Sequence, residues 1–236
     1  MPKARSRKPA QSDERGLSKD AVLNAALEII DARGLDAFSM RALAQHLKVY
    51  PTAIYWYVPN KNALLAEVVR VALRDTVPKS PPRDWEPFLT KVFHGYRTAD
   101  RKHPNIAPLI GAQLVSNWGA DFKLVDSILE ALSAAGFEGE QLLAVYDVLI
   151  AAMVGFVTME FANLPTEDAG PWAEKMQEMV KEIDKSAYPH LHEHKAKLAN
   201  RHFILRWENG VTVPLDRSFK TYVDATINGL KQLPRR

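Results

Sequence analysis

One short segment near the N-terminus combines the side chains that a protein needs to contact DNA. Thr52 supplies a hydroxyl and Ala53 a methyl group, which suit a base edge and the methyl of thymine. Tyr55, Trp56 and Tyr57 follow at once. Tyrosine hydroxyls are common partners of phosphate oxygens. We therefore expect this segment to contact both base edges and the backbone of a duplex.

Lys61 adds a cation where a helix is expected to begin. Asn60 is a favourable N-cap, so Lys61 would lie in the first turn, where its charge opposes the helix dipole by about 0.3–1 kcal/mol. The same helix terminus attracts a phosphate, and a lysine strengthens that attraction. We interpret Lys61 as a phosphate anchor; a solvated surface lysine is the alternative.

Two short helical patterns around a tight connection would hold these residues. Ser39 is a candidate N-cap for the first, and Pro51 suits the first position of the second. Ile54 and Val58 share one helix face, so we expect them to be buried and Trp56 to point away from them. An exposed tryptophan predicts a docking surface. The pattern favours a helix-turn-helix over a protein–protein surface or a small aromatic core.

Residues 17–69 resemble the N-terminal DNA-binding domain of the tetracycline-repressor (TetR) family without a gap. The resemblance includes a Ser18-capped first helix with its stop at Arg33-Gly34-Leu35, the start Ser39-Met40-Arg41, Ile54-Tyr55-Trp56-Tyr57 and Asn60-Lys61-Asn62-Ala63-Leu64-Leu65. It implies that the first helix braces the reading helices, with Lys19 near the DNA backbone. The family usually has Gly or Ser in the connection where this chain has Lys48 and Tyr50, so Tyr50 cannot be the usual cap. The expected DNA contacts are Lys19, Arg41, Lys48, Tyr50, Thr52, Ala53, Tyr55, Trp56, Tyr57 and Lys61.

A basic arm, residues 1–16, precedes the first helix. Residues 1–19 hold six basic and two acidic side chains, a net charge of +4 against +3 for the whole chain. With few apolar residues the arm is expected to be disordered in the free protein. We expect it to follow the phosphates or enter the minor groove; an ordinary solvated tail is the alternative. No apolar segment follows its charges, so it does not resemble a secretory signal.

The composition indicates a soluble globular protein. There is no cysteine among the 236 residues, which excludes disulfides and thiolate metal sites and favours a cytoplasmic location. The longest apolar run, residues 142–164, has an uncharged centre of only 12 residues, 148–159. That is shorter than the roughly 20 residues of a membrane span. We expect a helix buried within its domain and against a partner.

The predicted fold is all-α, with a helix-turn-helix domain at 17–77 and a larger helical domain at 83–236, divided by the proline-rich residues 77–82. Helical periodicity predicts elements at 85–103, 106–115, 118–135, 140–163, 172–185 and 217–233. Residues 188–214 are harder to assign. Their Glu208-Asn209-Gly210 turn signal is compatible with a hairpin between 203–205 and 211–213.

This second domain resembles the corresponding TetR-family domain more loosely. The resemblance implies a homodimer built from helices 140–163 and 217–233, and a pocket for a small-molecule effector. Two reading helices about 34 Å apart would reach successive major grooves of a near-palindromic site. Candidate pocket residues, each of which could equally be a core side chain, are Trp85, Phe88, His94, Tyr96, Trp118, Met153, Phe156 and Met159.

A histidine cluster supplies the only candidate for metal chemistry. His190 and His194 are four residues apart, with His192 between them and His202 downstream, but the HExxH order of zinc hydrolases is missing. No phosphate loop or nucleophile elbow is present either, so we expect neither an enzyme nor a cofactor. The sequence predicts a repressor released from operator DNA by a small molecule. A DNA-binding dimer without an effector and a metal-binding protein are the alternatives.

Overall fold

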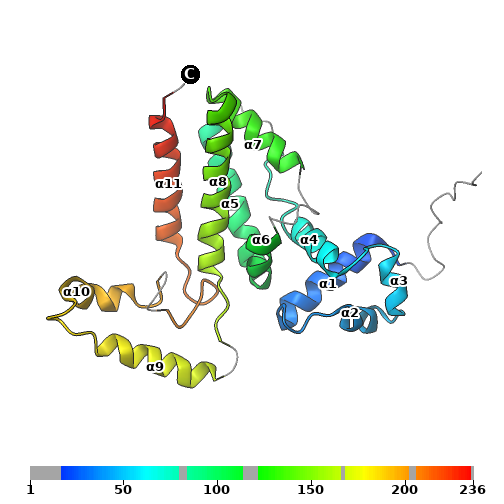
Figure 1. Cartoon of the computed structure of the whole chain (residues 1–236), viewed down its shortest axis with the longest axis horizontal. Helices are drawn as coiled ribbons and strands as arrows, with labels where there is room; N and C mark the ends of the chain where they lie inside the picture. Colours follow the sequence, from blue (N-terminus) through cyan, green and yellow to red (C-terminus); the bar gives the residue numbers. More distant parts are fainter. Residues whose placement is uncertain (1–16, 80–83, 114–121, 166–167, 202–205, 235–236) are drawn as a thin grey trace, which may run out of the picture.

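The computed structural model describes residues 17–79, 84–113, 122–165, 168–201 and 206–234, and all regular elements within these ranges are helical (Figure 1). The N-terminal part contains α1 (Lys19–Arg33), α2 (Met40–Leu47), α3 (Pro51–Tyr55) and α4 (Lys61–Ala72). The expected basic arm lies outside the described residues.

Side-chain caps begin three of these four helices. The side chains of Ser18, Ser39 and Asn60 accept hydrogen bonds from backbone N–H groups in the first turns of α1, α2 and α4, at 3.1, 3.0 and 2.9 Å. Each cap satisfies an N–H group that the helix itself leaves unpaired. Gly34 ends α1 with a φ of 77° and donates its N–H to Ile30. All four of these predicted helix boundaries are confirmed.

The larger domain begins with α5 (Trp85–Lys102), the short 3-10 helix η1 (Pro104–Ile106), α6 (Ala107–Gln113) and α7 (Phe122–Ala134). It continues with α8 (Gly139–Glu160), α9 (Ala169–Lys181), α10 (Pro189–Leu198) and α11 (Asp216–Gln232). Figure 1 shows α8 and α11 side by side, with α9 and α10 extending from the lower end of this pair. By length and composition α8 could cross a membrane, but here it packs against α5, α6, α7 and α11.

The hairpin expected between residues 203–205 and 211–213 is only half described, because residues 203–205 lie outside the described residues. Residues 211–213 lie in turns, where the N–H groups of Thr212 and Val213 donate to the carbonyl of Asn209. The neighbouring backbone instead closes the end of α8, because Gly210 donates its N–H to the carbonyl of Glu160 at 2.7 Å. The turn signal is confirmed, and the second arm of the expected hairpin is a turn and not a strand.

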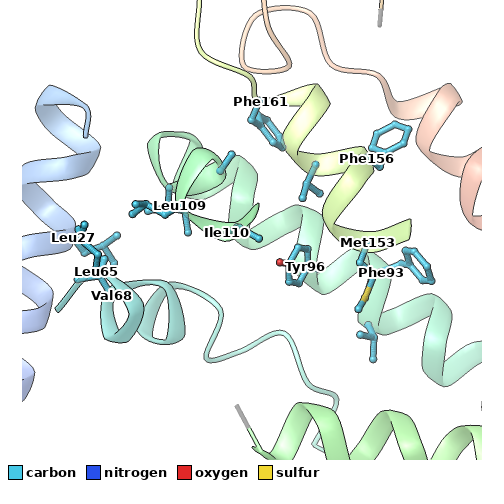
Figure 2. Close-up of a cluster of buried hydrophobic side chains, with 14 of the residues drawn as sticks. Leu27, Leu65, Val68, Phe93, Tyr96, Leu109, Ile110, Met153, Phe156 and Phe161 are labelled. Atoms are coloured by element: carbon cyan, nitrogen blue, oxygen red, sulfur yellow. The ribbon is translucent and has the colours of Figure 1, made fainter. Parts of the chain in front are cut away.

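Apolar packing continues from one domain into the other. Figure 2 shows Leu109 and Ile110 of α6 between the N-terminal domain and the larger domain. Leu27, Leu65 and Val68 lie on the side of α1 and α4, and Tyr96, Met153, Phe156 and Phe161 lie on the side of α5 and α8. The helix α6 is therefore packed against both the N-terminal domain and the core of the larger domain.

A buried ion pair joins the ends of α5, α8 and α11. Arg97 donates from Nε and Nη2 to the two carboxylate oxygens of Glu160, at 2.7 and 2.6 Å. Leu215, immediately before α11, donates its N–H to the same carboxylate at 3.0 Å. Both side chains are nearly excluded from solvent, so each charge depends on the other for compensation.

Asp100 is a second buried acid near Glu160, and it has no comparable partner. The residue is fully buried, and neither carboxyl oxygen forms a hydrogen bond. Burial, and then the charge of Glu160, raise the pKa of Asp100 to about 8. At neutral pH this side chain is therefore a neutral carboxylic acid.

We predict that Asp100 makes folding stability depend on pH. Between about pH 4 and 8 the unfolded chain loses the proton that the folded chain retains, so stability falls as pH rises, by up to about 1.4 kcal/mol per pH unit. Asp100→Asn should lack this loss. Urea unfolding at pH 6 and pH 8 should show the wild type losing stability relative to this variant. The exposed Asp126→Asn serves as control, and parallel behaviour of all three proteins would contradict the prediction.

Candidate nucleic-acid interface

The helix α3 presents one side to the core and the other to solvent. Ile54 and Val58 are 0% and 2% exposed, whereas Trp56 is 89% exposed. Thr52 is exposed and Ala53 half-buried on the same side as the tryptophan. The predicted burial of Ile54 and Val58 and the outward direction of Trp56 are confirmed. A hydroxyl, a methyl group and a large aromatic ring are thus presented together.

The turn before α3 has an unusual residue in a left-handed conformation. Lys48 ends α2 with φ 56° and ψ 40°, which costs a residue with a Cβ about 1–2 kcal/mol. Tyr50 precedes α3 without a side-chain cap and is 77% exposed. Pro51 in the first helical position has no N–H group to satisfy. The lysine and the tyrosine at this turn therefore both extend into solvent beside the reading side of α3.

Tyr57, a predicted DNA contact, already forms a hydrogen bond within the protein. Its hydroxyl donates to the carbonyl of Leu17 at 2.8 Å, and its ring is half-buried. A phenol has a single O–H, so this hydroxyl cannot donate to a phosphate at the same time. Tyr57 instead fixes the residue just before α1 to the end of the reading segment. This pairing spans 40 residues and has no signal in the local sequence pattern.

The cations that are predicted to contact phosphates differ in whether they already have a partner within the protein. Lys19 forms an ion pair with Glu67 at 3.1 Å. Lys61 donates to the carbonyl of Phe38 at 3.1 Å but is exposed and retains two further ammonium protons. Arg41 and Lys48 are exposed and have no ion pair within the described residues. Positive charge therefore borders the reading helix on the α2 and α4 sides.

Glu67 has a second partner that the sequence reasoning missed. Arg70 donates to it at 2.7 Å, three residues along α4. Burial opposes ionisation of Glu67, but the bonds from Arg70 and Lys19 outweigh it and lower the pKa of this carboxyl. Glu67 therefore stays charged and holds Lys19 against α4, so that the ammonium group is partly neutralised.

The predicted effector residues lie in several different environments. Phe88, Tyr96, Met153 and Phe156 are buried in the core, and Trp85 is half-buried. His94 is exposed and meets the ring of Phe219 edge-on at 5.1 Å. Trp118 lies outside the described residues. Phe156 and Met159 line a groove of about 490 Å³ between α8 and α11.

The histidine cluster lies on α10, where His190 and His194 are exposed. Within the described residues no group of three or more potential ligands is placed to hold a metal ion, and His202 lies outside them.

Comparison with known proteins gives the same family for both parts of the chain. Residues 22–68 match the family model for bacterial regulatory proteins of the tetR family, and residues 77–232 match that for the tetracyclin repressor-like C-terminal domain. The class E tetracycline repressor of Escherichia coli is 31% identical over 156 residues, which are 64% of this chain and 72% of the relative.

Two solved structures have the same fold. ActR of Streptomyces coelicolor in complex with actinorhodin aligns with a TM-score of 0.66 and 23% identity, covering 91% of this chain and 96% of ActR. BioQ with its double-stranded DNA operator aligns with a TM-score of 0.62 and 22% identity, covering 92% and 99% of the two chains.

We predict that Lys48 has two separable effects: its left-handed backbone lowers folding stability, and its charge strengthens DNA binding. Lys48→Gly should stabilise the fold by up to about 1 kcal/mol, because glycine adopts the left-handed conformation at no steric cost. It should also weaken binding to DNA and lower the slope of log K against log salt by about 0.9 if the lysine contacts one phosphate. Lys48→Gln keeps the strain and should change only the DNA binding. Urea unfolding and salt-dependent titration measure the two effects, and a destabilised glycine variant would be the contrary result.

Proposed function

Because the chain belongs to the tetR family of bacterial regulatory proteins and is therefore a DNA-binding transcriptional regulator, we propose that it represses transcription as a homodimer that occupies a near-palindromic operator. The observation that carries the proposal is the 89% exposed Trp56 beside an exposed Thr52 on a helix whose other side is buried. Exposure of an aromatic side chain of this size to water is unfavourable, and a partner that covers it removes this free-energy cost. The protein would act in the cytoplasm, where its operator lies.

The reading helix would enter the major groove with Thr52 and Ala53 toward the base edges. Arg41, Lys48 and Lys61 would then face the phosphates on either side of the groove. Contacts with phosphates raise the affinity for DNA but do not distinguish one sequence from another. Tyr57 would hold the helix in position through Leu17. Lys19 would contact the backbone with its charge partly neutralised by Glu67.

Exposed apolar residues on α8 support a dimer. Leu143 and Val148 are 55% and 53% exposed, and both lie on a helix whose other side is packed in the core. The helix α11 runs beside α8 at the edge of the domain (Figure 1). Two copies that paired these helices would bury the exposed apolar side chains and set the spacing of the two reading helices.

Contacts between the domains support release by an effector. Asn105 donates to the carbonyls of Ile30 and Asp31 at 3.0 and 3.1 Å, and His103 pairs with the carboxylate of Asp31 at 2.7 Å. These bonds join the segment between α5 and α6 to the end of α1. A ligand that shifts this segment would change the orientation of the DNA-binding domain and so the spacing of the two reading helices. ActR has been solved with actinorhodin; for this chain we propose only a small organic effector.

We predict that Trp56 serves binding and not folding. Trp56→Ala should change stability by no more than about 0.5 kcal/mol, because the side chain is already in water. It should reduce affinity for a duplex selected from random DNA by about ten-fold or more, the typical loss for an aromatic residue at the centre of an interface. Selection should also recover an inverted repeat, which tests the proposed function directly.

The matched control for this experiment is Phe122→Ala, because Phe122 is 82% exposed and belongs to α7, which lies apart from α3 (Figure 1). It should bind the selected duplex like the wild type. Wild-type affinity in Trp56→Ala, or failure of the selection to enrich any sequence, would refute the proposal.

We predict that a charge at Val148 breaks the dimer. Val148→Asp would place a carboxylate between two apolar helices, where it lacks a partner, and should give a monomer in sedimentation with much weaker operator binding. Val211→Asp is the control, since Val211 is equally exposed at 54% but lies in a turn outside α8 and α11. A Val148→Asp protein that still sediments like the wild type would place the interface elsewhere.

A further inference from the structure

The hydrogen bond between Tyr57 and Leu17 lies at the point where the basic arm joins the fold. The Tyr57 hydroxyl donates to the Leu17 carbonyl at 2.8 Å, and Leu17 immediately precedes Ser18, the N-cap of α1. Tyr57 follows the exposed Trp56 of the reading segment. The first residue after the arm is therefore held within the length of one tyrosine side chain from the surface that is proposed to contact DNA.

The start of α1 is held on both sides of its cap. Leu17 packs its side chain against the core, and Lys19 forms an ion pair with Glu67 of α4 at 3.1 Å. The bond from Tyr57 fixes the plane of the peptide group between Leu17 and Ser18, because the carbonyl lies in that plane. The same plane contains the Cα of Leu17, so the bond sets the direction in which the preceding chain leaves α1.

The arm carries most of its positive charge in its first half. Residues 1–8 contain no acidic side chain and four basic ones, Lys3, Arg5, Arg7 and Lys8. The chain from Lys8 to Leu17 spans at most about 30 Å when it is fully extended. Neighbouring grooves of a duplex are about 17 Å apart, half of the 34 Å turn. An arm that starts at Leu17 can therefore bring its basic side chains to the phosphates beyond the major groove that α3 would occupy.

We propose that Tyr57 is a positioning residue that directs the basic arm onto the duplex beside the reading helix. This inference rests on the proposed function, because it requires that the chain binds DNA. Tyr57 acts through the carbonyl of Leu17 and not by touching DNA. A hydrogen bond of this kind changes an equilibrium constant by about two- to ten-fold, which limits the share of the affinity that Tyr57 controls. Binding of the arm stabilises the Tyr57–Leu17 bond in return, because such coupling is reciprocal.

A double-mutant cycle on the full chain tests this coupling. Tyr57→Phe removes the hydroxyl alone, and the neutral-arm variant is Lys3→Gln/Arg5→Gln/Arg7→Gln/Lys8→Gln. With a duplex selected by the wild type, Tyr57→Phe should lower affinity by about three-fold or more when the arm is basic. It should change the affinity of the neutral-arm variant by less than about 1.5-fold, because the position of the arm then no longer matters. The slope of log K against log salt should likewise fall only when the arm is basic.

Two controls separate the arm from general effects. Tyr188→Phe removes a phenol hydroxyl from an exposed residue just before α10, and it should bind the duplex like the wild type. The variant Lys91→Gln/Lys175→Gln/Lys185→Gln/Lys197→Gln removes the same charge from exposed positions of the larger domain. Tyr57→Phe should keep its full effect on affinity in that chain.

An equal loss of affinity in the basic-arm and neutral-arm chains would show that Tyr57 only supports the fold of the reading helix, and it would overturn the inference. Absence of any loss in the basic-arm chain would overturn it as well. Both outcomes leave the proposed function intact, because the wild type still binds its duplex, whereas a wild type that binds no duplex would refute the two together. Urea unfolding without DNA measures the structural share of the hydroxyl, and Tyr57→Phe should lose the same stability with either arm.

Discussion

Burial of Ile54 and Val58 is the constraint on which the reading of DNA depends. A helix of five residues, Pro51–Tyr55, is far too short to be stable alone, because nucleation is unfavourable and few hydrogen bonds are gained. Its orientation is therefore set by the two side chains that enter the core and by Tyr57, which bonds to the carbonyl of Leu17. When these three side chains are fixed, the side chain of Trp56 points toward solvent. The exposed reading side is a consequence of the packing on the opposite side.

The same reasoning extends to the position of the whole DNA-binding unit. A reading helix is useful in a dimer only if its distance from its counterpart is defined, so the unit must be held by the domain that dimerises. The two domains are connected at the end of α1. Asn105 donates hydrogen bonds to two of the last carbonyl groups of this helix, and His103 pairs with the carboxylate of Asp31. These are polar contacts at a helix terminus beside the apolar contacts of α6 (Figure 2).

Local sequence patterns predicted the helices, but they did not predict the contacts between residues that are far apart in the chain. Ser18, Ser39 and Asn60 act within three residues of their own position, which is why capping and periodicity found the starts of α1, α2 and α4. The partners of Tyr57 and Lys19 lie 40 and 48 residues away, and no spacing rule connects them. Asn209 was identified as a turn residue, but no local signal showed that the neighbouring Gly210 donates its N–H to the carbonyl of Glu160 at the end of α8. Helical spacing likewise identified Phe156 and Met159 as neighbours on α8, but it could not show that α11 leaves a groove beside them.

The charged cluster around Glu160 shows why these ends of three helices form one unit. A buried ion pair adds little to stability by itself, yet loss of one partner leaves an uncompensated charge. Glu160 is held by Arg97 of α5 and by the backbone before α11, and Arg97 also binds Asp216 at the first position of α11. The ends of α5, α8 and α11 cannot separate without exposing a charge that has lost its partner. The same helix α5 leads directly to His103, which pairs with Asp31 of α1, so a single helix connects the Glu160 cluster to the DNA-binding unit.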